Sequence, residues 1–273
     1  MAIKAADVSK LRQMTGAGMM DCKAALTEAN GDFDAAVDAI RRKGQLVASK
    51  RADREATEGC VLAATKDNAG MVIALRCETD FVAKNESFVA FAKSILDAAL
   101  EAGASSIEEV NALPLANSTV AEQIVDQTGV IGEKIELAFA EKVADATVVS
   151  YVHPGNGLAV VVALNKEVAD IQVGKDVAMQ VAAMNPVSIN KDGVPADVIA
   201  HELEIGKAKA REEGKPEEML DKIAQGRLGK FFKESTLLEQ AFVKENKLSV
   251  DQYLKSVDKD LTVTAFKRYA LAD

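Results

Sequence analysis

The side chains that usually carry out catalysis are few or scattered in this sequence. Its two histidines, His153 and His201, lie in no serine-histidine-aspartate or cysteine-histidine pattern. The sequence contains neither the phosphate-binding motif G-x-x-x-x-G-K-[ST] nor a G-x-G-x-x-G motif that leads into a helix. Its 42 acidic residues make adjacent carboxylates such as Glu108 and Glu109 inevitable, so such a pair does not indicate acid-base chemistry. The sequence therefore favours a binding protein over an enzyme.

The cysteines and the N-terminus indicate the compartment. Cys22, Cys60 and Cys77 form no C-x-x-C pair, so they match neither a disulfide framework nor a zinc site, and we expect no metal and no cofactor. The start MAIKAADVSK has no apolar run after its basic residue, and the chain contains no stretch of about 18 consecutive apolar residues. We therefore expect a soluble protein of a reducing, cytoplasmic compartment that does not interact with a membrane.

The charge balance argues against a nucleic-acid partner. The chain has 33 basic and 42 acidic residues and a formal charge of −9, which would repel a phosphate backbone. Residues 1–54 hold ten Lys or Arg and seven Asp or Glu, so their balance is +3 and the remaining chain carries −12. This asymmetry fits either a solvated helical face or a docking surface for an acidic partner.

One polar and aromatic cluster, Glu78-Thr79-Asp80-Phe81-Val82, lies between a predicted strand and a predicted helix. In the structural interpretation, Thr79 or Asp80 caps the helix while Phe81 and Val82 fasten it to the sheet. In the functional interpretation, Phe81 points outward as an aromatic anchor with Asp80 beside it, as is typical of interface hot spots.

The elements around this cluster follow from the spacing of apolar residues. Residues 5–43 predict three short helices, with breaks at Thr15-Gly16-Ala17-Gly18 and Asn30-Gly31 and with Asp32 as a cap for the third. Residues 44–58 contain few large apolar side chains and resemble a linker or an exposed helix extension.

A strand, tight turn, strand and helix then occur twice, first over residues 60–99 and again over residues 148–184. We infer two related α+β subdomains with antiparallel sheets. The charged stretch from Pro195 to Phe232, broken at Gly214-Lys215-Pro216, predicts two antiparallel helices that project as an arm. Residues 261–266 predict a strand that returns to the second sheet.

Two motifs add a resemblance to these expectations. The run LRQMTGAGMMDCKAAL from Leu11 to Leu26, together with Thr79-Asp80-Phe81-Val82-Ala83, closely resembles the bacterial elongation factor Ts family. The likeness covers essentially the whole chain, through Leu237-Leu238-Glu239-Gln240-Ala241-Phe242-Val243 near its end. Members of this family are guanine-nucleotide exchange factors of the translational GTPase elongation factor Tu.

The resemblance implies a division of the chain into modules. These are a ubiquitin-associated-like helical module with its linker, a core subdomain N, a core subdomain C, a helical-hairpin arm inserted in subdomain C, and a C-terminal segment. The helical module with its linker spans residues 1–54, subdomain N spans 55–140, and subdomain C spans 141–184 plus 229–262. The arm spans 185–228, and the C-terminal segment spans 263–273.

The resemblance also implies site residues. Thr79, Asp80, Phe81 and Val82 match the segment that intrudes beside the Mg²⁺ site of elongation factor Tu in this family. By position, Leu11, Met19 and Met20 would join the contact between the N-terminal module and the GTPase domain, although Met19 and Met20 also suit the core of a small module. His153 matches a position that contacts a distal domain of the partner. After it, this chain has Gly157-Leu158-Ala159 where relatives often have Arg-Ile-Gly, which removes a charged contact.

We therefore expect a protein that binds the GDP form of elongation factor Tu, disturbs its Mg²⁺ site and promotes GDP release without covalent chemistry. The sequence allows the arm to form a homodimer or a 2:2 assembly with the partner. One alternative is an interaction scaffold that has no effect on nucleotides, and another is a hydrolase built from scattered carboxylates.

Overall fold

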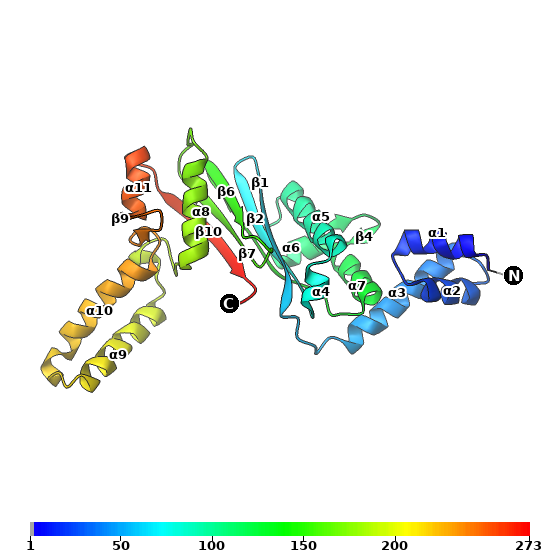
Figure 1. Ribbon diagram of the computed structural model, residues 1–273, viewed down its shortest axis with the longest axis horizontal. Coiled ribbons are helices and arrows are strands. Elements are labelled where there is room, and N and C mark those ends of the chain that lie inside the picture. The colour runs from blue at the N-terminus through cyan, green and yellow to red at the C-terminus, as the bar shows by residue number, and fades with distance from the viewer. Residues whose placement is uncertain (1–2) are drawn as a thin grey trace.

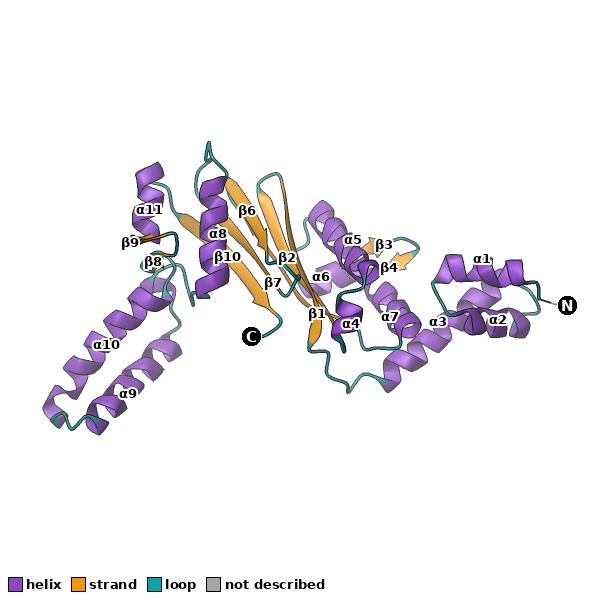
Figure 2. Ribbon diagram, in the orientation of Figure 1, coloured by secondary structure: helices purple, strands orange, loops and turns teal. Residues whose placement is uncertain are grey.

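The computed structural model describes residues 3–273 and has the expected α+β fold (Figure 1). Two small antiparallel sheets lie in the middle of an elongated molecule, with a three-helix module at one end and a helical hairpin at the other (Figure 2). Residues 1–2 of the expected N-terminal module lie outside the described residues. None of the helices between residues 3 and 273 combines the length and the apolar composition that a membrane span requires.

The N-terminal module consists of three helices, as predicted: α1 (Ala5–Thr15), α2 (Met19–Glu28) and α3 (Phe33–Lys50). The left-handed φ of 71° at Gly16 ends α1. The Asp32 carboxylate caps α3, because it accepts a hydrogen bond from the Ala35 amide at 3.0 Å. The module has its own small apolar core, which contains Val8, Leu11, Ala17, Cys22, Ala25, Leu26 and Ala36.

Helix α3 is longer than the apolar spacing predicts. It continues past residue 43 to Lys50, so the first part of the segment 44–58 is a helix extension and only the rest is a linker. Gly44 is buried within α3, and it faces Gly129 of helix α7 (Val120–Ile131). A Cβ atom added at Gly129 would lie 2.4 Å from the Gly44 Cα atom. The two glycines let the helices approach closely, so α3 packs on the core of the molecule.

The first sheet has the strand order β1-β2-β5, all antiparallel. The predicted pair is β1 (Glu58–Lys66) and β2 (Ala69–Cys77), and the third strand, β5 (Glu136–Ala144), was not predicted. It crosses the boundary at residue 140 that the resemblance implies. The connecting elements are α4 (Asp80–Ala83), α5 (Glu86–Ala102), α6 (Ile107–Ala112), the short pair β3 (Pro114–Leu115) and β4 (Ser118–Thr119), and α7.

The second sheet has the order β10-β7-β6, also antiparallel. Its strands are β6 (Thr147–Val152), β7 (Leu158–Leu164) and β10 (Val263–Ala270). The predicted return of the chain near residue 261 is therefore confirmed, and residues 263–270 form a strand of this sheet rather than a separate segment. The other elements of this part of the chain are helices α8 (Gln172–Met184) and α11 (Val250–Val257) and the hairpin of β8 (Ala241–Phe242) and β9 (Glu245–Ser249).

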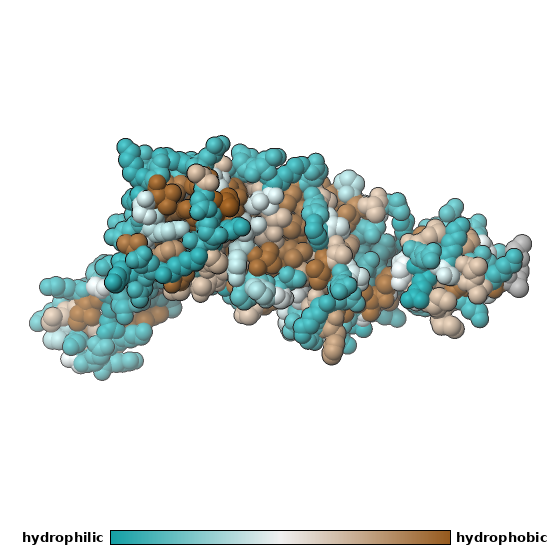
Figure 3. Space-filling view, turned by 45° about the horizontal axis from the view of Figure 1, so that its top comes forward, coloured by the Kyte–Doolittle hydropathy of each residue, from teal (hydrophilic) through white to brown (hydrophobic). Residues whose placement is uncertain are grey.

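The two sheets pack face to face. Residues of β1 and β2 alternate, with Ile73 and Leu75 facing helices α5 to α7 and Val72 and Ala74 facing the second sheet. The strands are therefore apolar on both faces. A Cβ atom added at Gly70 would lie 2.6 Å from the Val148 Cγ1 atom, which shows how closely the sheets approach. On one face of the molecule, apolar side chains gather over this central region (Figure 3).

The predicted arm consists of α9 (Ala196–Glu212) and α10 (Leu220–Ser235), joined through Gly214 and the short 3-10 helix Glu217–Met219. Another 3-10 helix, Lys191–Gly193, precedes α9. Small residues meet where the helices cross, because a Cβ atom added at Gly206 would lie 3.1 Å from the Ala224 Cα atom. The arm points away from the sheets (Figure 1), as expected, but α10 runs beyond its implied end at residue 228.

Candidate functional site

The Phe81 side chain stands outside the fold. It is 86% exposed, the highest value among the exposed large apolar side chains of residues 3–273. Phe81 lies on α4, a single helical turn that follows the exit of β2. The neighbouring Val82 is half-buried against the core of the first sheet. Val82, with Ala83 beside it, therefore fastens this turn to the sheet, and Phe81 is left free to contact another molecule.

Thr79 is the cap of α4, as the structural interpretation predicted. Its Oγ1 atom accepts a hydrogen bond from the Val82 amide at 3.4 Å. Asp80 is the first residue of the turn, and Lys84 donates a 2.6 Å hydrogen bond to its carboxylate. This hydrogen bond, together with the positive charge of Lys84, lowers the pKa of Asp80. Phe81 is thus presented beside a carboxylate that stays ionised at neutral pH.

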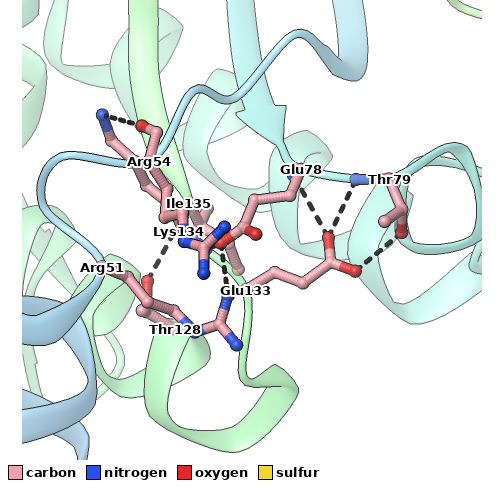
Figure 4. A network of polar contacts seen from close by, with 8 residues as sticks. All are labelled: Arg51, Arg54, Glu78, Thr79, Thr128, Glu133, Lys134 and Ile135. Atoms are coloured by element: carbon pink, nitrogen blue, oxygen red, sulfur yellow. Dashed lines mark hydrogen bonds and ion pairs between the residues drawn. The ribbon is translucent and has the colours of Figure 1, made fainter.

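Glu133 holds the chain immediately before α4 (Figure 4). Its Oε2 atom accepts hydrogen bonds from the backbone amides of Glu78 and Thr79 at 3.1 and 3.0 Å. Its Oε1 atom accepts the Thr79 hydroxyl at 2.7 Å. One carboxylate therefore binds three donors within two successive residues.

Glu78 makes the opposite contact, from the end of β2 to the loop that carries Glu133. Its Oε1 atom accepts the Lys134 amide at 2.6 Å and the Arg51 guanidinium at 2.7 Å. These bonds, with the Lys134 amide first, lower the pKa of Glu78, although partial burial acts against them. Lys134 also donates from Nζ to the Arg54 carbonyl at 3.0 Å. The linker after α3, the end of β2 and the loop after α7 therefore meet at one point (Figure 4).

This network has no signal in the sequence. Glu133 and Thr79 are separated by 54 residues, and neither residue type nor local spacing marks them as partners. Only the antiparallel pairing of β2 with the unpredicted strand β5 brings them together.

The three predicted contact residues of the N-terminal module are not equivalent. Met19 and Met20 begin α2 and are 45% and 74% exposed, so they are not core residues of the module, and Met14 near the end of α1 is also exposed. Leu11, in contrast, has no exposed surface and packs in the core of the module. We correct its expected role accordingly, because a buried side chain supports the surface without touching a partner.

His153 lies at a third place, the turn between β6 and β7. It is exposed, and its Nδ1 atom lies 2.9 Å from the Tyr151 hydroxyl. The turn is held against the first sheet, because the Val61 amide donates to the Asn156 carbonyl at 2.7 Å. The candidate residues thus lie on the N-terminal module, on α4 beside the first sheet, and on a turn of the second sheet (Figure 1). An extended partner surface would have to reach all three.

Comparison with known proteins gives a consistent result. A sequence model of the family described as "Elongation factor TS" matches residues 78–273, a range that begins at the Glu78 of the network. The chain is similar to a protein named "Elongation factor Ts" from Porphyromonas gingivalis, with 53% identity over 272 residues and 99% of each chain covered. Proteins of the same name from Flavobacterium psychrophilum and Bacteroides fragilis are 50% and 42% identical, with 98% and 99% of each chain covered.

Proposed function

This chain belongs to the elongation factor Ts family and is a translation elongation factor, and we propose that it promotes the release of GDP from elongation factor Tu. In this proposal it binds the GDP form of that GTPase in the cytoplasm, where elongation takes place, and lets GTP bind afterwards. The protein acts by binding alone, without a covalent step. The observation that carries the proposal is the exposed Phe81 ring, held on a short turn beside an ionised carboxylate.

The proposed target is the Mg²⁺ ion that binds with the nucleotide. Mg²⁺ needs six oxygen ligands in nearly ideal octahedral geometry, and nucleotide phosphates and a hydroxyl supply part of that set in GTPases. A small displacement of the supporting loop or helix is therefore costly. Phe81 inserts between side chains of the partner and shifts that support, while Asp80 stabilises the displaced arrangement. The contacts of the metal and of the phosphates then weaken together.

The proposed coupling between binding of the factor and binding of the nucleotide acts in both directions. A factor that weakens GDP binding must itself be released when a nucleotide rebinds, because binding couplings are reciprocal. Burial of one Phe side chain supplies roughly 1.5 to 3 kcal/mol, and about 1.4 kcal/mol corresponds to a tenfold change in affinity. Phe81 alone accounts for an effect of that size and no more. Contacts made by Met19, Met20 and His153 must therefore hold it in place.

Substitution of the two α4 residues tests this proposal. Phe81→Ala and Asp80→Ala are expected to lower the maximal rate of stimulated GDP release, for Phe81→Ala by roughly tenfold or more. The concentration of factor that gives half of that rate should change much less. The rates are measured with fluorescent GDP on elongation factor Tu. Ile171→Ala, which also truncates an exposed apolar side chain, is the control and should behave like the unchanged protein.

Two outcomes would contradict the proposal. If the unchanged protein binds elongation factor Tu but does not accelerate GDP release, the scaffold alternative is correct. If Phe81→Ala weakens binding and maximal rate equally, Phe81 is an ordinary contact. Assembly of two copies through α9 and α10 stays a prediction, and the mass of the complex in light scattering checks it.

A further inference from the structure

Helix α4, which presents Phe81, has little packing of its own. It has four residues, and none of its side chains is buried. A helix this short is not stable in water without outside support, because the first turn fixes several residues for few hydrogen bonds. Its apolar attachment is limited to the half-buried Val82 and Ala83. The direction in which Phe81 points must therefore be set mainly by what holds the chain at the start of the turn.

The backbone pairing of the sheet stops just before this point. The last paired residues of β2 and β5 are Arg76 and Glu136. Beyond them, side chains take over the cross-strand bonds in a reciprocal manner. The Glu133 carboxylate accepts the amides of Glu78 and Thr79, and the Glu78 carboxylate accepts the amide of Lys134. Hydrogen bonds to ionised carboxylates are stronger than neutral ones, so the two segments are joined firmly.

The loop that carries Glu133 is itself fixed. Helix α7 ends at Ile131, and Gly132 adopts the left-handed φ of 82° that turns the chain toward β5. Within the same loop, the Ile135 amide donates to the Thr128 hydroxyl at 3.3 Å, and this hydroxyl donates to the Ile124 carbonyl at 3.0 Å. Arg51 approaches from the linker after α3 and binds Glu78. The carboxylate of Glu133 thus rests on a rigid base.

We propose that Glu133 is a positioning residue for nucleotide exchange, which fixes α4 so that Phe81 and Asp80 meet the partner in one orientation. This inference rests on the proposed function for its kinetic consequence. Its structural part concerns the free chain and can be measured without a partner. Glu133 itself contacts neither the nucleotide nor its metal in this scheme, since it acts through Thr79.

Hydrogen exchange on the free chain tests the structural part. In Glu133→Ala the amides of Glu78, Thr79 and Val82 are expected to exchange roughly tenfold faster or more, because three bonds to a charged acceptor are lost. In Glu133→Gln the amide oxygen can still accept both backbone amides while its nitrogen donates to Thr79, so exchange should stay near that of the unchanged protein. Glu101→Ala removes an exposed glutamate of α5 and should leave the segment unaffected. Unchanged exchange in Glu133→Ala would overturn the proposal.

Exchange kinetics on elongation factor Tu test the functional part. Glu133→Ala should lower the maximal rate of GDP release by roughly tenfold, while the half-saturating concentration stays within about twofold. Glu133→Gln should restore most of the maximal rate. A merely structural role would not separate these two parameters. An equal loss in both, or no rescue by Gln, would overturn the positioning role.

The failure of this inference can be told from failure of the proposed function. If Phe81→Ala lowers the maximal rate and Glu133→Ala does not, exchange proceeds through Phe81 and Glu133 is not needed. If the unchanged protein gives no acceleration at all, the proposed function fails, and the inference fails with it whatever hydrogen exchange shows. Where circular dichroism shows that Glu133→Ala is unfolded, Glu133→Asp replaces it in both assays, because its shorter carboxylate cannot reach the same three donors.

Discussion

At the scale of single residues, burial lowers the reactivity of the cysteine thiols. Cys22, Cys60 and Cys77 have no exposed surface. Burial raises the pKa of Cys60 to about 11 and that of Cys77 to about 12, and the nearby charge of Glu133 adds to the second shift. Cys77 also donates a 3.3 Å hydrogen bond from Sγ to the Thr79 carbonyl, directly before α4. The nucleophilic thiolate form of both residues is thus suppressed at neutral pH.

Thiol labelling checks this expectation. In the folded protein at pH 8, Cys60 and Cys77 should not react with Ellman's reagent on the time scale of free cysteine, and they should react at once in denaturant. Peptide mapping after labelling distinguishes them from Cys22. Rapid modification of Cys77 in the folded state would show that the end of β2 opens readily, and would also contradict a rigid attachment of α4 at Thr79.

Residue types predicted part of the geometry of the candidate site. The motif Thr79 to Val82 marked the turn that carries the exposed Phe81, and of the two cap candidates, Thr79 and Asp80, the structure shows Thr79 as the cap. Spacing could not decide whether Phe81 faces the sheet or solvent, because Val82 next to it satisfies the same demand for one apolar contact. For the same reason Leu11 and Met20 look alike in the sequence, although one is buried and the other 74% exposed.

At the scale of elements, glycine has opposite effects in the two helices of the arm. Gly226 lies within α10, and an added Cβ atom would meet nothing within 4 Å. Gly206 lies within α9, and an added Cβ atom would lie 3.1 Å from Cα and 3.2 Å from Cβ of Ala224. The first glycine only costs helix propensity, whereas the second permits the close contact of the helices.

A pair of alanine substitutions separates these roles. Gly226→Ala should stabilise the arm by about 0.5 to 1 kcal/mol, since Ala loses less conformational entropy in a helix than Gly. Gly206→Ala should destabilise the arm, because the new methyl group pushes α9 away from α10. Hydrogen exchange of the α10 amides measures both effects within one element. Equal stabilisation by the two changes would mean that the helices do not pack as described.

The degree of burial of each element explains which elements could be predicted from the sequence. Strands β1, β2, β6 and β7 have long apolar runs and clear turns, because both faces of each sheet are covered. The pattern of β5 is weaker, since Phe139 and Glu141 are only half-buried, and this strand was missed. The extension of α3 was ambiguous because Gly44 normally weakens a helix. Its contact with Gly129 depends on tertiary structure, which local spacing does not report.

At the scale of the whole molecule, the N-terminal module is joined to α4 through one helix. Helix α3 packs on α7 at Gly44 and Gly129, with Arg41 3.9 Å from Asp126, and just after its end Arg51 binds Glu78. The exposed Met14, Met19 and Met20 flank the turn between α1 and α2 of the same module. The exposed Met19 and Met20, which we propose contact the partner, and Phe81 on α4 are thus connected through α3 and Arg51. The two contacts nevertheless use different residues.

Substitution of the exposed methionines and deletion of the whole N-terminal module should therefore have different kinetic effects. The double change Met19→Ala and Met20→Ala removes exposed side chains, so the fold should be unaffected. It should raise the half-saturating concentration by roughly tenfold or more while the maximal rate of GDP release changes little. Deletion of residues 1–54 should raise the same concentration and also lower the maximal rate, because it removes Arg51 from Glu78. Fluorescent GDP release with both proteins decides the matter. Normal affinity after the deletion would refute docking by the module, and an unchanged maximal rate would show that α4 needs no support from the linker after α3.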